Sequence, residues 1–182
     1  MNLWALPQTH KIVDTVYNLN TDYRDILEII EYLNDKSRNE LLRWRIAVAL
    51  FYVQDVPDEH LQEAMNYLAE FISVGAADDK SNPKLLDWQQ DAQMIVSSVN
   101  KVAGKEIRAL EHMHWWTFVG LFHEIGEGQL STIVSIRHKK ATNKKLDKWE
   151  EEFYQENREK VDFQNHADPE MDAIKAYFDK WL

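Results

Sequence analysis

The chain has 182 residues, of which 45% are hydrophobic and 12% aromatic, and its formal net charge at neutral pH is −10. This length and apolar content suit one globular domain, or one domain with an extension, and they exclude a wholly disordered chain. The negative charge disfavours binding to nucleic acid or to an anionic membrane surface, and the lack of cysteine excludes disulfides, thiolate metal sites and cysteine nucleophiles.

Targeting signals are not evident in the sequence. The N-terminus lacks the basic region and following apolar run of a signal peptide. No stretch approaches the ~18–20 consecutive apolar residues that a membrane-spanning helix needs. The sequence therefore predicts an intracellular, soluble protein.

Residues 1–20 are the least helical part of the chain. Val13, Thr15, Tyr17 and Leu19 alternate with Asp14, Asn18 and Asn20, which predicts a short strand. A two-stranded hairpin over roughly residues 9–19 fits this pattern, although no Asn-Gly or Asp-Gly turn fixes it. An irregular arm is the alternative.

Two helices are predicted next. The first follows a cap at Asn20 or Thr21, and the second opens with a capping-box pattern of Ser37 and Glu40. Nearly every residue of 46–53 is apolar, which predicts that the second helix lies in the middle of a core. The apolar face of the first helix consists of Tyr23, Ile26, Leu27, Ile30 and Leu33.

Four further helices complete the predicted bundle. A third starts at Pro57 and stops at Gly75, and a fourth runs from about Pro83 to Gly104 after a polar loop at 76–82. A central helix runs from Glu106 to Gly126. A shorter one, about Gln129 to Lys140, places Leu130, Ile133, Val134 and Arg137 on one side.

The central helix carries apolar residues on two sides. His114 and Trp115 lie on one face, where we expect a buried imidazole bonded to Glu111 or to a backbone carbonyl. The opposite face carries His112, Trp116, Val119 and His123 at three- and four-residue spacing. Trp116 belongs either to a second packing layer or to a surface that binds other proteins.

The fold class that follows is all-α, an irregular bundle of five to six helices with a short N-terminal hairpin where the strand pattern occurs. We divide the chain into an N-terminal arm or hairpin (1–20), a helical domain (21–140) and a charged helical C-terminal extension (141–182). In the extension, Leu146, Trp149, Phe153 and Val161 can hold a helix, and a last short helix follows Pro169.

Motifs for catalysis or cofactor binding are not found. The glycines form no phosphate-binding loop, and no G-x-S-x-G elbow occurs. His123 and Glu124 half-resemble a zinc-helix signature, but Glu127 replaces the second histidine. We expect no catalytic, cofactor or metal site, and we expect the lysines of 137–148 to pair with neighbouring glutamates rather than with nucleic acid.

Four groups of residues resemble the bacteriophage gp-fifteen family, tail-module proteins of phages and prophages of Gram-positive bacteria. Together they span about residues 20–137. The His-Trp-Trp triplet, followed by Ile-Arg about twenty residues later, is the most specific part. The groups are Asn20–Arg24, Asp87–Ala92 with Ile95, His114–Trp116 with Phe118 and Leu121, and Ile133 with Ser135–Arg137.

The resemblance implies a tail-assembly role, with no enzymatic activity, in the cytoplasm of the bacterial host. We predict an assembly chaperone that shields apolar helical segments of the tape-measure protein or of other tail components. A structural protein of the virion tail is the alternative, and a small metal-dependent enzyme is a minor one; self-association into a homo-oligomer stays open. The candidate partner-binding residues are His112, Trp116, Val119, His123, Trp149 and Phe153.

Overall fold

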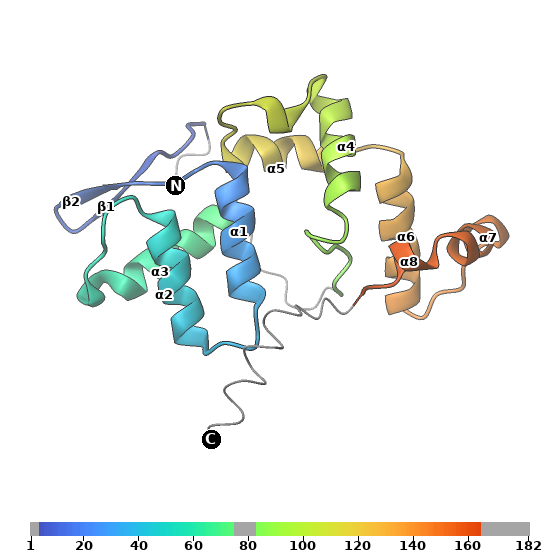
Figure 1. The fold of residues 1–182 in the computed structure, drawn as a ribbon, viewed down its shortest axis with the longest axis horizontal. Coiled ribbons are helices and arrows are strands. Elements are labelled where there is room, and N and C mark those ends of the chain that lie inside the picture. Colours follow the sequence, from blue (N-terminus) through green and yellow to red (C-terminus); the bar gives the residue numbers. More distant parts are fainter. Residues whose placement is uncertain (1–3, 75–82, 165–182) are drawn as a thin grey trace. The chain divides into compact units, whose positions relative to one another are not determined.

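The computed structural model describes residues 4–74 and 83–164 (Figure 1). These residues are mainly helical with one short N-terminal hairpin, which confirms the predicted fold class. No helix in these two ranges has the length and apolar character needed to cross a bilayer.

The chain packs as two compact units that do not follow the order of the sequence. Among the described residues, the first unit comprises 4–74 and 93–128, and the second comprises 83–92 and 129–164. The chain therefore passes into the second unit, returns to the first and leaves it again. The division at residues 20 and 140 proposed above rests on composition, whereas these two units rest on contacts.

The N-terminal hairpin belongs to the first unit. Strand β1 (Thr9–Ile12) pairs with β2 (Thr15–Asn18) in antiparallel register, with Val13 and Asp14 in the turn between them. Val13 has a φ of 53°, in the left-handed region that a tight hairpin turn requires. The ladder continues beyond β2, because Leu19 bridges Tyr52 and thereby joins the hairpin to the end of the second helix.

The first two helices lie where the sequence predicts them, but other residues cap them. Helix α1 (Tyr23–Asn34) is capped by Asp22, whose carboxylate accepts from the amide of Arg24 at 3.0 Å. Helix α2 (Glu40–Phe51) is capped by Asn39, so the capping box predicted at Ser37 is wrong. The Ser37 hydroxyl instead donates to Asp35, which holds Ser37 in the turn before α2.

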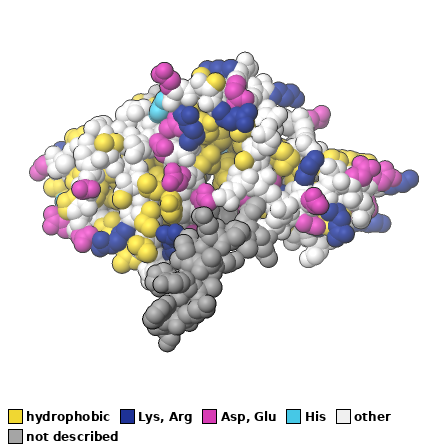
Figure 2. Space-filling view, in the orientation of Figure 1, with side chains coloured by type: hydrophobic (Ala, Val, Ile, Leu, Met, Phe, Trp, Pro, Cys, Tyr) yellow, Lys and Arg dark blue, Asp and Glu magenta, His cyan; other side chains and the backbone are white. Residues whose placement is uncertain are grey.

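Beyond Arg45, helix α2 is apolar on all sides, yet it is buried on one side only. Ala47, Val48 and Phe51 are buried where α2 packs against α1 and α3. The expectation that α2 lies in the middle of a core is therefore wrong. Figure 2 shows hydrophobic side chains at the surface over α1 and α2. We name the side of α2 turned away from its buried residues the α2 outer face, which carries Leu42, Ile46 and Ala49 together with the exposed Arg45.

The next two helices are shorter than predicted. Helix α3 (Leu61–Ile72) follows a 3₁₀ turn (η1, Asp58–His60), and the predicted stop at Gly75 and loop at 76–82 lie outside the described residues. Helix α4 (Ala92–Ala103) begins well after Pro83, and Gly104 ends it with a φ of 67°. The residues before α4 are held in a turn because the Asp87 carboxylate accepts from the amides of Gln89 and Gln90.

The second unit contains the remaining helices. Helix α6 confirms the predicted short helix, and its inner side is formed by Leu130, Ile133, Ile136 and Arg137. A true capping box, with Asp147 and Glu150, starts α7. The helix predicted after Pro169 lies outside the described residues. The bounds are α6 (Gln129–Ala141), α7 (Lys148–Glu156) and α8 (Arg158–Val161).

Candidate functional site

The segment around the double tryptophan is not one long helix. A 3₁₀ turn (η2, Ile107–Ala109) is capped by Glu106, and helix α5 (Trp115–His123) starts only after His114. The prediction of a continuous helix from Glu106 is therefore wrong. Helix α5 starts late because of a long-range contact. His114 forms an antiparallel bridge with Asp22, and this bridge fixes the preceding backbone in an extended conformation.

This bridge joins two of the sequence groups that are far apart along the chain. The amide of Tyr23 donates to the Met113 carbonyl at 2.9 Å, and the amide of Trp115 donates to the Thr21 carbonyl at 2.7 Å. The Asp22 carboxylate accepts from the Met113 amide at 2.8 Å as well as from the Arg24 guanidinium. Asp22 thus caps α1 and secures the segment that leads into α5.

His114 uses both ring nitrogens in this junction. Its Nδ1 accepts from the amide of Trp116 at 3.1 Å, which caps α5, and its Nε2 donates to the Pro7 carbonyl at 3.0 Å. The prediction of a buried imidazole bonded to a backbone carbonyl is confirmed, with Pro7 rather than Glu111 as the neighbour. Burial lowers the pKa of His114 from its ordinary 6.5, the Pro7 bond partly opposes that shift, and His112 adds to it.

The His114 geometry predicts a loss of stability in mild acid. The unfolded chain binds a proton near pH 6.5, whereas the folded chain binds it only at a lower pH, so the free energy of unfolding should fall as pH drops below about 6.5. His114→Asn keeps a capping oxygen that does not titrate, and urea titrations from about pH 7.5 to about pH 5 should show a shallower dependence. Some dependence should remain, because burial also lowers the pKa of His10.

The matched control for this measurement is His123→Asn at an exposed position at the end of α5. It should follow the wild-type pH dependence. If His114→Asn also follows the wild-type curve throughout, the junction is not the source of the acid sensitivity.

Both tryptophans of the triplet donate hydrogen bonds to the C-terminal end of helix α3. The indole Nε1 of Trp115 donates to the Ile72 carbonyl at 2.9 Å, and that of Trp116 donates to the Phe71 carbonyl at 3.0 Å. These are carbonyls of the last turn of α3, and the Phe71 carbonyl also accepts from the Val74 amide at 3.2 Å. Trp116 is only 7% exposed, so it is a core residue, and the alternative of an exposed interaction surface at this position is wrong.

The other candidate partner-binding residues are dispersed. His112 is exposed but precedes α5 and lies 3.2 Å from the Thr21 hydroxyl, while Val119 is half-buried and His123 is exposed. They do not form a continuous exposed face with Trp116, because α5 starts after His112. On α7, by contrast, Trp149 is 57% exposed and Phe153 is half-buried one turn away.

The second unit is organised around a buried ion pair. Asp91 is fully buried, and its two carboxylate oxygens accept from the Arg137 guanidinium at 2.5 and 3.0 Å. The remaining donors of Arg137 reach the carbonyls of Leu85, Lys160 and Val161. One side chain of α6 therefore holds together the 83–92 segment and α8.

Sequence reasoning assigned no role to this pair. The two residues lie in separate groups of the family resemblance, and an arginine on the apolar side of α6 was the one available signal. A buried arginine requires an anionic partner, but a separation of 46 positions leaves no local pattern that identifies it.

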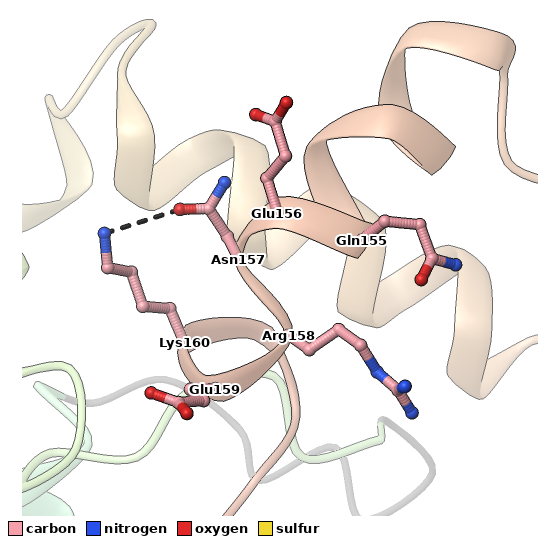
Figure 3. A pocket seen from close by; sticks show the side chains of 6 residues that line it. All are labelled: Gln155, Glu156, Asn157, Arg158, Glu159 and Lys160. Carbon is pink, nitrogen blue, oxygen red and sulfur yellow. Dashed lines mark hydrogen bonds between the residues drawn. The ribbon is translucent and has the colours of Figure 1, made fainter.

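Groups for catalysis do not converge in the described part of the chain. A pocket of about 390 Å³ lies at the end of α7 and on α8, lined by residues 155–160 (Figure 3). Figure 3 shows their side chains pointing in different directions, with only Lys160 directed toward Asn157. No three His, Cys, Asp or Glu side chains in the described ranges are placed to hold a metal ion, and α5 ends at His123, before Glu127.

Comparison with known proteins gives one family. The model of the family described as "Bacteriophage Gp15 protein" matches residues 5–163. This range includes the junction at His114, the Asp91–Arg137 pair and α7, and it extends the resemblance of residues 20–137 in both directions. Searches of curated proteins and of solved structures found no match.

Proposed function

Because the chain belongs to the bacteriophage Gp15 protein family, and is thereby a phage structural or morphogenesis protein, we propose that it acts as a tail-assembly chaperone. In this proposal its clients are apolar helical segments of the tape-measure protein or of another tail component. It acts in the host cytoplasm, binds proteins rather than nucleic acid or membranes, and catalyses no reaction.

The α2 outer face is the observation that carries this proposal. Leu42 is 49% exposed and Ala49 is exposed, on a helix whose opposite side is already packed in the core, and Arg45 beside them is paired with Asp58. Leu42, Ile46 and Ala49 follow four- and three-residue spacing, so they line one side of α2 over two turns. Exposed apolar side chains aligned along a helix are typical of a surface that receives another helix.

The shape of the α2 outer face suits a helical client. A helix with apolar residues at positions i, i+3 or i+4, and i+7 can place them between Leu42 and Ile46. The small side chain of Ala49 allows the two backbones to approach closely at one end of the contact. Burial of such residues stabilises the complex by roughly 25 cal/mol for each Å² of apolar surface removed from water.

Charge near this face indicates which clients fit best. Asp25, Glu28 and Glu31 are exposed along α1, the helix that packs beside α2. Their negative potential favours client segments whose apolar residues are flanked by lysine or arginine.

Co-expression with the tape-measure chain of the same phage tests the proposal. The wild-type protein should raise the soluble fraction of that chain and co-purify with it, whereas Leu42→Glu combined with Ala49→Glu should abolish both effects. Thr117→Glu, which adds a charge at an exposed polar position of α5, is the matched control and should behave as wild type. Failure of the wild-type protein to solubilise or bind the tape-measure chain would contradict the chaperone role.

The alternative, a structural protein of the tail, differs in one measurable property. A chaperone leaves before the tail is complete, so mass spectrometry of purified particles should not detect this chain. Its recovery in particles at a fixed copy number per tail would support the structural role instead.

A further inference from the structure

The last described residues of the chain close over the second unit. We name residues 158–164, which comprise α8 and the three residues after it, the C-terminal latch. Val161 is 1% exposed and is the only buried side chain of the latch, whereas its other side chains are half-buried or exposed. Little apolar surface therefore holds the latch in place.

Two side chains of the second unit hold the latch by its backbone. The Gln90 side-chain nitrogen donates to the Asp162 carbonyl at 2.9 Å, and the Gln90 side-chain oxygen accepts from the Gln164 amide at 3.0 Å. Arg137 donates two further bonds, each of 2.7 Å, to carbonyls of α8. Water can take the place of each protein partner when the latch moves away, so the net cost of breaking these bonds is modest.

The ion pair beneath the latch does not depend on the latch. Asp91 belongs to the 83–92 segment and Arg137 belongs to α6, and the two side chains are joined directly at 2.5 and 3.0 Å. Opening of the latch leaves this pair intact. It also lets water reach the Arg137 guanidinium, and hydration of a buried charge offsets part of the hydrogen bonding that is lost.

The remaining contacts of the latch lie near the surface. Lys140 pairs with Asp162, and both side chains are more than a third exposed. The Phe163 ring, which is 38% exposed, has its centroid 4.3 Å from the Arg137 guanidinium, and the Tyr154 hydroxyl donates to Asp162 at 2.9 Å. Exposed ion pairs contribute little to stability, so these contacts do not close the latch permanently.

Asn157 is placed to act as the hinge of the latch. It lies between α7 and α8 with a φ of −126° and a ψ of 28°, outside both helices. Helix α7, on the other side of this hinge, is fixed independently because Lys139 of α6 binds both Asp147 and Glu150. The latch can therefore rotate about Asn157 without displacing α7.

We propose that the C-terminal latch opens and closes as one unit about Asn157 while the rest of the protein stays folded. In the closed state, latch carbonyls occupy the donors of Gln90 and Arg137. In the open state the same donors face water, and the pair of Asp91 and Arg137 continues to join α6 to the 83–92 segment. The latch is thus a conformational switch within the second unit, and it does not depend on the chaperone role.

Amide hydrogen exchange of the full chain, resolved by residue with NMR, tests this proposal. In the closed latch the amides of Val161 and Asp162 donate to carbonyls one turn earlier, and the Gln164 amide donates to Gln90. After correction for intrinsic exchange rates, these three amides should share one protection factor. That factor should be at least about tenfold lower than the factors in the middle of α6, because the latch opens without α6.

Gln90→Ala weakens the closed latch without touching the ion pair. The protection of the Val161 and Asp162 amides should fall by about a further tenfold, although their own acceptors are retained, and the protection of α6 should not change. Gln155→Ala is the matched control, at an exposed glutamine of α7 that donates to Glu151, and should leave every protection factor unchanged.

A thiol probe gives a second measurement that does not rely on amide protection. The chain has no cysteine, so Val161→Cys introduces a single thiol at a buried position of the latch. Its alkylation by iodoacetamide should be at least about tenfold faster than that of Ile133→Cys, at a buried position of α6. Equal alkylation rates overturn the proposal. So does a latch as protected as α6, or a Gln90→Ala variant in which α6 and the latch lose protection together.

Discussion

Replacing Arg137 with methionine is expected to lower the free energy of unfolding by about 3–5 kcal/mol. The substitution leaves the Asp91 carboxylate fully buried without its cationic partner, and it also removes donors from the carbonyls of Leu85, Lys160 and Val161. Most of the lost stability should come from the missing ionic partner and not from lost packing, because methionine retains much of the apolar volume of arginine.

The control for this prediction is Lys140→Met on the same helix. Lys140 pairs with Asp162 at 2.5 Å, but both side chains are more than a third exposed, so its loss should cost at most about 1 kcal/mol. Urea unfolding followed by circular dichroism gives the two values. Hydrogen exchange should show that protection in Arg137→Met is lost first in residues 83–92 and in α8, and a uniform loss across both units would contradict this account.

Truncation of Trp116 to alanine is expected to destabilise the protein by about 3–5 kcal/mol. The indole is 7% exposed, packs against Phe71 with ring centroids 5.8 Å apart, and donates to the Phe71 carbonyl. Alanine therefore leaves a cavity and removes the indole donor from the Phe71 carbonyl, which keeps the Val74 amide.

Trp116→Phe separates these two contributions. Phenylalanine retains most of the ring volume but cannot donate to Phe71, so we expect a smaller loss of about 1–3 kcal/mol. Trp149→Ala is the control, because an exposed tryptophan should change the free energy of unfolding by no more than about 0.5 kcal/mol. A nearly neutral Trp116→Ala would show that the side chain is available for a partner after all.

The sequence was informative wherever local chemistry determines structure. The alternation before Leu19 indicated the hairpin, and the spacing of apolar residues located α1, α2 and α6. Gly104 ends α4 as predicted, because glycine adopts the positive φ of that position without strain. These features depend on interactions between residues a few positions apart, which a sequence displays directly.

Features that depend on distant residues could not be predicted. The start of α5 is fixed by the bridge from His114 to Asp22, and the apolar spacing of residues 106–114 gave no indication of it. The exposure of the α2 outer face also could not be predicted from local sequence. Its composition indicated burial on every side, but the rest of the described chain covers only the side with Ala47, Val48 and Phe51.

The candidate site shows both outcomes. Trp149 is a predicted partner-binding residue, and it is exposed. Trp116 is also a tryptophan at a similar helical spacing, but its indole is buried in the core, where it donates to the Phe71 carbonyl. Sequence alone does not distinguish them, because the residues that cover Trp116 come from a helix about 45 positions earlier.

The ion pair between Asp91 and Arg137 also constrains the order in which the chain can fold during translation. Asp91 is synthesised well before Arg137 and the carbonyl of Val161 that completes the cluster. At ~5–20 residues per second, this interval is on the order of several seconds, during which the carboxylate has to remain hydrated. Residues 93–128 can meanwhile join the N-terminal helices, so the second unit should form last, after translation has passed α8.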